Sequence, residues 1–187
     1  MAAPEHLILH GLEGSGPDHW QSWLARRLDA VAYPDLPDAV RPRRERWLAA
    51  LRDELDRAEQ PVVVCHSLAC VLWLHHAATR PPDGPTARRV LLVAPPCACA
   101  DVPAIADFFP VPRVARALAA AATGETRLVC SDDDPYCPEG AARAYAEGLA
   151  CPVDLIAGGG HLNADAGYGP WPAVEAWVRG ERADVVA

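Results

Sequence analysis

A serine stands where a run of apolar residues ends. Ser67 follows Val62-Val-Val-Cys-His66 and precedes Leu68-Ala-Cys70. An uninterrupted valine-rich run is typical of a strand in the buried centre of a parallel sheet, and the apolar residues after the serine are typical of a helix. A serine at such a strand-to-helix turn is the arrangement of a nucleophile elbow, which holds the hydroxyl above the sheet. The simpler alternative is that Ser67 only caps the helix.

The two residues that flank the elbow depart from its usual form. In G-x-S-x-G a glycine stands two residues before and two residues after the serine, whereas this chain has Cys65 and Ala69 there. Glycine is used because neighbouring backbones crowd these positions. Cysteine and alanine are also small, so the turn is feasible with them, and the departure bears on the reaction rate.

Two further loops each carry a residue that could act with this serine. The segment Ser131–Pro138, "SDDDPYCP", contains Asp134, and the proline after it favours an extended backbone there. The segment Gly158–Asn163, "GGGHLN", contains His161, and its three glycines indicate that the chain passes close to another segment. The order Ser67, Asp134, His161, each after a separate strand, is the order of α/β hydrolases, which favours the elbow over the cap.

The glycine-rich loop Gly11–Gly16 follows the first predicted strand. Its spacing is G-x-x-G-x-G, not the G-x-G-x-x-G of dinucleotide-binding loops, and it lacks the Gly-Lys-Ser/Thr of a phosphate-binding loop. Nucleotide binding is therefore a weak alternative. The backbone amides of Leu12 in this loop and of Leu68 after the serine are the candidates for an oxyanion hole.

The elements that would position these loops alternate along the chain. We predict strands at residues 7–10, 31–33, 62–65, 90–94, 126–130 and 153–156, and helices around 20–28 and at 43–57, 67–78, 113–122, 139–149 and 172–178. This alternation predicts one doubly wound α/β domain, residues 1–187, with about six parallel strands and helices on both faces. Residues 95–112 interrupt the pattern as a short cap or insertion, there is no large lid, and residues 181–187 are expected to be a frayed tail.

The composition of the chain limits the kinds of molecule that the protein is expected to bind. The net charge is −8 over 187 residues, which argues against nucleic acid or an anionic membrane as a partner. No apolar run reaches the roughly 20 residues of a membrane span, and "MAAPEHLILH" lacks the features of a signal peptide, so a cytoplasmic location is expected. The seven cysteines show no metal-ligand spacing, since Cys97-Ala-Cys99 is too tight. We expect neither a disulfide framework nor a metal or other cofactor.

Taken together, these segments resemble a known family: the small single-domain serine hydrolases of the α/β-hydrolase fold, of the retinoblastoma-binding-protein type. The resemblance spans nearly the whole chain and is carried by "GSGPDHWQSWL", "VVVCHSLAC", "SDDDPYCP" and "GGGHLNADAGYGPWP". It implies Ser67 as nucleophile, Asp134 as acid and His161 as base. It also implies a fold without the antiparallel hairpin that opens larger hydrolases. Ala69 replaces the glycine usual in the family.

The function expected from this site is hydrolysis of small or medium acyl esters through an acyl-enzyme, with thioesters and amides left open. The partner is then a small-molecule acyl substrate, and the sequence leaves the oligomeric state open. The alternative function is that of a binding or regulatory protein, which keeps the α/β-hydrolase fold but hydrolyses substrate only slowly. Candidate pocket residues are His10, Gly11, Trp20, Phe108, Phe109, Tyr136 and Trp171.

Overall fold

A six-stranded parallel sheet forms the centre of the computed structural model, which describes residues 3–138, 143, 145 and 147–186. The strand order is β2-β1-β3-β4-β5-β6, and every pairing is parallel. The strands are β1 (His6–Leu9), β2 (Val31–Ala32), β3 (Val62–His66), β4 (Arg89–Val93), β5 (Thr126–Ser131) and β6 (Val153–Ile156). The predicted doubly wound α/β-hydrolase architecture is confirmed.

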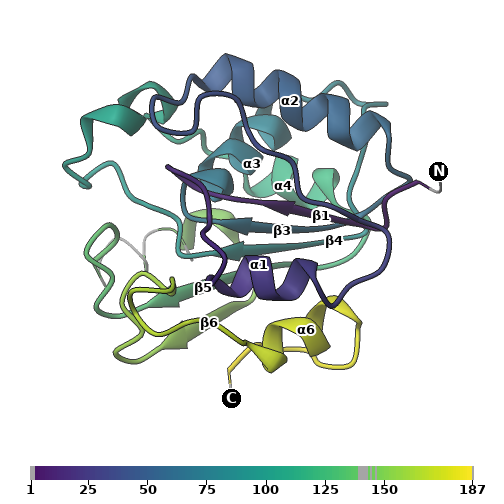
Figure 1. The fold of residues 1–187 in the computed structure, drawn as a ribbon. Coiled ribbons are helices and arrows are strands. Elements are labelled where there is room, and N and C mark those ends of the chain that lie inside the picture. Colours follow the sequence, from purple (N-terminus) through teal and green to yellow (C-terminus); the bar gives the residue numbers. More distant parts are fainter. Residues whose placement is uncertain (1–2, 139–142, 144, 146, 187) are drawn as a thin grey trace.

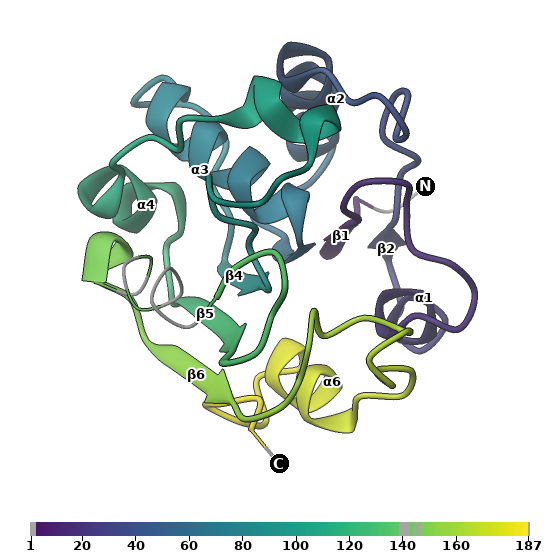
Figure 2. The same cartoon turned by 90° about the vertical axis from the view of Figure 1, so that its left-hand side faces the viewer.

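Helices cover both faces of the sheet. One face is covered by α2 (Arg44–Asp56), α3 (Leu68–Thr79) and α4 (Ala115–Ala121), and the other by α1 (Trp20–Ala25) and α6 (Pro172–Val178) (Figures 1 and 2). The predicted helix 139–149 is helical at 143, 145 and 147–149, and its remaining residues lie outside the described ones. No helix of the described residues is long and apolar enough to cross a membrane.

The two layers of core explain why β3 is hydrophobic throughout. Side chains of a strand alternate between the two faces of the sheet, and both faces are covered here. Val63 and Cys65 pack into the cluster under α2 and α3, whereas Val62 and Val64 pack into the cluster under α1 and α6. A central strand of a doubly covered sheet therefore has no solvent-facing positions, and all five residues of β3 are buried.

Residues 95–112, expected to be a short cap or insertion, lie between β4 and α4. They include a 3₁₀ helix, Pro103–Phe108, whose Ile105 and Phe108 are buried. Phe108 packs edge to face on Trp47 of α2, with ring centroids 5.4 Å apart. This contact anchors the segment to the helical layer beside α3.

The cysteine prediction is wrong at one pair. Cys97 and Cys99 are joined by a disulfide, because the tight turn after β4 brings their Cα atoms to 5.2 Å, within bridging range. Four of the other five cysteines are buried and free, as expected of small apolar residues. Among the described residues, no group of His, Cys, Asp and Glu side chains is arranged to hold a metal ion.

Part of the C-terminal tail, which was expected to be frayed, packs against the sheet at Val185. Val185 is 1% exposed and packs in the cluster under α1 and α6. Its amide donates a hydrogen bond of 2.8 Å to Asp154 Oδ2 in β6. The other oxygen of Asp154 accepts a 2.7 Å bond from Arg127 in β5. The buried carboxylate thus holds the tail against the sheet edge.

Replacing Asp154 with alanine should destabilise the protein by about 2–3 kcal/mol, because the largely buried Arg127 guanidinium keeps only Glu125 as a carboxylate partner and the buried Val185 amide loses its acceptor. Urea denaturation measures this. The matched control is Asp184→Ala, which breaks an ion pair with Arg182 whose side chains are 41% and 50% exposed; it should change stability by less than about 0.5 kcal/mol. Equal effects of the two substitutions would contradict the assigned role of Asp154.

Candidate active site

Ser67 stands at a strained turn between β3 and α3. Its backbone has φ 54° and ψ −123°, a conformation that non-glycine residues rarely adopt. Its amide donates a 2.9 Å bond to Val93 O of the neighbouring strand, and its carbonyl accepts from the Cys70 amide. Its side chain makes no capping hydrogen bond to the helix. The helix-cap alternative therefore does not describe this serine, whereas strain at a turn is common at functional sites.

The loop after β1 packs closely against this turn at Gly11. Cys65 and Ala69 are fully buried, so small side chains do fill the two flanking positions. A Cβ added at Gly11 would lie 2.7 Å from Ser67 Cβ and 3.2 Å from Ser67 Oγ. Only glycine lets the loop pass this close to the serine.

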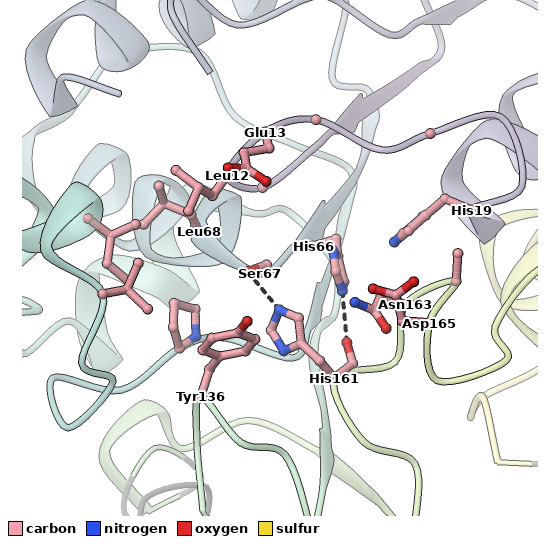
Figure 3. Close-up of a pocket in the computed structure, with 17 residues that line it drawn as sticks. Leu12, Glu13, His19, His66, Ser67, Leu68, Tyr136, His161, Asn163 and Asp165 are labelled. Carbon is pink, nitrogen blue, oxygen red and sulfur yellow. Dashed lines mark hydrogen bonds between the residues drawn. The ribbon is translucent and has the colours of Figure 1, made fainter. Parts of the chain in front are cut away.

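His161 lies between Ser67 and Asp134. A dashed line in Figure 3 marks its hydrogen bond with Ser67. Its Nε2 is 2.9 Å from Ser67 Oγ. Its Nδ1 is 2.9 Å from Asp134 Oδ2 and 3.1 Å from Oδ1. Because a carboxylate only accepts, Nδ1 carries the proton and Nε2 presents a lone pair to the serine hydroxyl. The structure thus brings together the three residues singled out in the sequence.

The loop that carries His161 is held by the residues next to Asp134. Three successive glycine amides donate to three successive side chains of the acidic run: Gly158 to Asp132 (2.8 Å), Gly159 to Ser131 (2.9 Å) and Gly160 to Asp133 (2.7 Å). We call these three bonds, together with the His161–Asp134 pair, the glycine clamp. The hydrogen bonds from Ser131 and Gly160 lower the pKa of Asp133.

Two buried side chains also hold the carbonyls of the same loop. His66 Nε2 donates to His161 O at 3.0 Å, and Trp20 Nε1 donates to Leu162 O at 2.8 Å. Burial, and then the neighbouring His161 and His19, lower the pKa of His66 well below its usual value. His66 is therefore a neutral donor that holds the loop. The sequence gives no signal for this contact, because its partner is a backbone carbonyl 95 residues away.

His10 holds the loop after β1 from beneath and does not line the cavity. Its Nδ1 donates to Gly11 O at 2.8 Å, and its Nε2 accepts from the Leu36 amide at 3.1 Å. Leu12 and Leu68, the predicted oxyanion-hole residues, both line the cavity beside Ser67. Leu68 is the first residue of α3, so its amide has no partner within the helix.

The cavity at Ser67 has a volume of about 420 Å³. Of the pocket residues expected from the sequence, Gly11 and Tyr136 line it. The other aromatic residues are misassigned because their faces turn into the core: Trp20 packs edge to face on Trp171, and Phe108 packs on Trp47. Phe109 lines a separate hollow.

Several lining residues were missed in the sequence, where no periodic or motif signal separates them from loop residues: Glu13, His19, His66, Pro96, Val102, Ile105, Asn163 and Asp165. Two further histidines, His75 and His76, are buried in α3. The Nε2 of His75 donates to Phe108 O at 2.7 Å.

Comparison with known proteins shows the class. The serine hydrolase family model matches residues 6–179, and the chain therefore belongs to the serine hydrolase family. It is a hydrolase with an α/β-hydrolase fold, as its resemblance to small serine hydrolases implied.

Among its relatives is YdeN of Bacillus subtilis, named a candidate hydrolase, which is 26% identical over 175 residues that cover 89% of this chain and 90% of YdeN. The solved structure of the B. subtilis ydeN product has a TM-score of 0.79 at 23% identity, covering 95% of this chain and 98% of that one. A YdeN-like protein of Pectobacterium atrosepticum has a TM-score of 0.75 at 24% identity, with coverage of 94% and 89%.

Substituting Gly11 with alanine should lower stability by about 1–3 kcal/mol, because the new methyl group overlaps the Ser67 turn and the surrounding backbone has to shift. The control is Gly148→Ala, where an added Cβ meets nothing within 4 Å and helical alanine is favoured. Urea denaturation compares the two. A Gly11→Ala protein as stable as the control would show that the loop is not tightly packed on Ser67.

Replacing Asp133 with alanine should release the glycine clamp locally. The Gly160 amide loses its acceptor, so its hydrogen exchange should accelerate by at least about tenfold, while peptides from β5 keep their protection. Asp165→Ala is the control, since this carboxylate in the same loop makes no hydrogen bond with a described residue. Unchanged exchange at residues 158–160 in Asp133→Ala would rule out the clamp.

Proposed function

We propose that this hydrolase cleaves small or medium acyl esters through a covalent acyl-serine at Ser67. The observation that carries the proposal is the pair of contacts made by one imidazole, with Nε2 at 2.9 Å from the serine hydroxyl and Nδ1 at 2.9 Å from a buried carboxylate. Serine is a weak nucleophile at neutral pH, and this arrangement supplies the base that it needs.

In the first half-reaction His161 Nε2 takes the Ser67 proton as Oγ bonds to the acyl carbon. The imidazolium then returns this proton to the leaving oxygen, and the bond from that oxygen to the acyl carbon breaks. Asp134 keeps the ring in one tautomer and stabilises its charged form. In the second half-reaction His161 Nε2 takes a proton from a water molecule as its oxygen bonds to the acyl carbon. The bond from the acyl carbon to Ser67 Oγ then breaks, the proton returns to Oγ, and the acid is released.

The oxyanion that forms in each half-reaction would accept hydrogen bonds from the Leu12 and Leu68 amides. Each donor of this kind is typically worth roughly 10²–10³ in rate. Both amides belong to backbone held by packing, because Gly11 contacts Ser67 and Leu68 begins α3. Donors fixed before the reaction need no reorganisation when the charge develops.

The size of the cavity supports a small or medium acyl group. Its volume is about 420 Å³, and Val102 and Ile105 from the 95–112 segment form part of its wall. A long acyl chain would extend beyond this wall into solvent and gain no burial. Esters, thioesters and amides all pass through the same steps, and a substrate series separates them.

Ser67→Ala should abolish labelling by a fluorophosphonate probe and lower hydrolysis of a short activated ester by roughly 10⁴-fold or more, and His161→Ala should lower the same hydrolysis comparably. Ser22→Ala is the matched control, since Ser22 lies on α1 and its hydroxyl donates to Ser15 O. Circular dichroism checks that each variant is folded. Hydrolysis at the wild-type rate in folded Ser67→Ala would refute the nucleophile, and an unlabelled wild-type protein would favour a binding role.

A further inference from the structure

The cavity at Ser67 has chemically different sides. Figure 3 shows Leu68 and Tyr136 on one side of the serine, and His19, Asn163 and Asp165 on the other. Glu13 lies in the wall contributed by the loop after β1. The acyl chain of the proposed substrate would lie on the apolar side, which leaves the other side for a polar part of the substrate.

The cavity is lined by two carboxylates, Glu13 and Asp165, without a compensating cation among the lining residues. The side-chain carboxylates of Glu13 and Asp165 make no hydrogen bond or ion pair with another described residue. No arginine is among the residues that line the cavity, and the chain contains no lysine. Two like charges around one small cavity repel an anionic group and offer acceptors to a hydrogen-bond donor.

His19 adds a hydrogen-bond donor to the same side. Its Nδ1 accepts a bond of 3.1 Å from the Gln21 amide, so its proton is on Nε2. The residue is 5% exposed, and Nε2 has no hydrogen-bond partner among the described residues. The ring extends from the start of α1 toward His66, with ring centroids 4.7 Å apart (Figure 3).

The protonation state of this histidine is fixed by its surroundings. Burial, followed by the nearby His161, lowers the pKa of His19 to about 4. The ring is neutral at physiological pH and has one N–H to offer. A buried donor without a partner is unfavourable, and a group entering the cavity with an acceptor oxygen would relieve this.

We propose that the polar side binds an uncharged hydroxyl group of the substrate, whose oxygen accepts from His19 Nε2–H and whose proton is donated to the carboxylate of Glu13 or Asp165. A hydroxyl group can both accept a hydrogen bond from His19 and donate one to a carboxylate, whereas an ammonium group only donates and a carboxylate only accepts. The substrate class is then short-acyl esters of polyhydroxylated alcohols. This inference rests on the proposed esterase reaction at Ser67.

Four butyrate esters with alcohols of similar size test the proposal: 2,3-dihydroxypropyl, propyl, 2-carboxyethyl and choline esters. Each kcat/KM is divided by the rate of hydroxide-catalysed hydrolysis of that ester, which removes differences in intrinsic reactivity. The dihydroxypropyl ester should exceed the propyl ester by about tenfold, as expected for two added hydrogen bonds. The carboxyethyl ester should fall about tenfold below the propyl ester.

Variants assign the preference to named groups. His19→Asn keeps a side chain suited to capping α1 but has no ring N–H. The ratio of kcat/KM for the dihydroxypropyl ester to that for the propyl ester should therefore fall most of the way to one. Asp165→Asn should relax the penalty on the carboxyethyl ester. Asp184→Asn removes an equal charge outside the cavity and should leave both ratios unchanged.

The outcomes separate this inference from the function on which it rests. If all four esters react at the rate of Ser67→Ala, the esterase proposal itself fails. If propyl butyrate is hydrolysed at Ser67 but the dihydroxypropyl ester has no advantage, or the choline ester is preferred to it, the hydroxyl site is refuted. An equal loss with every ester in His19→Asn would assign His19 a structural role only and would also overturn the proposal.

Discussion

The site depends on the hydrogen bonds between the loop after β5 and the loop after β6. The two strands are paired in parallel, with Ser131 opposite Ile156, so their carboxyl ends open side by side at one edge of the sheet. Three glycines precede His161, and Gly158 and Gly160 have positive φ values. Such a segment has little intrinsic preference for one conformation. The glycine clamp gives its amides acceptors and thereby fixes where the imidazole points.

The serine turn depends on a different constraint, the burial of β3 and α3. A non-glycine residue at φ 54° costs on the order of 1–2 kcal/mol, and the turn persists because its neighbours allow no alternative. β3 is buried along its whole length, and α3 has ten buried residues among its twelve. Close backbone approach to the serine occurs at Gly11, whereas the small side chains of Cys65 and Ala69 fill the two elbow positions.

The sequence predicts the strands, and with them the positions of Ser67, Asp134 and His161, because parallel strands place the residues that follow them at one edge. The pocket is harder to predict. Trp20 has the helical spacing of a core residue and the position of a pocket residue, and only the rotation of α1 decides between them. Asp132 and Asp133 are indistinguishable in sequence from a solvated acidic loop, because their partners are amides 26 and 27 residues away.

The path of the chain after β4 explains how these loops can meet at all. β4 lies between the strand of the serine and the strand of the aspartate, so a loop rising straight from it would separate His161 from Ser67. Instead the chain turns away at Ala94, where φ is 52°, and enters Pro95-Pro96. The backbone amide of Cys97 then donates a hydrogen bond of 2.9 Å to Tyr136 O, in the loop that carries Asp134. This segment therefore leaves the sheet edge open for the imidazole of His161. Further along, its Val102 and Ile105 form part of the cavity wall. That wall limits the size of the group that can reach the serine.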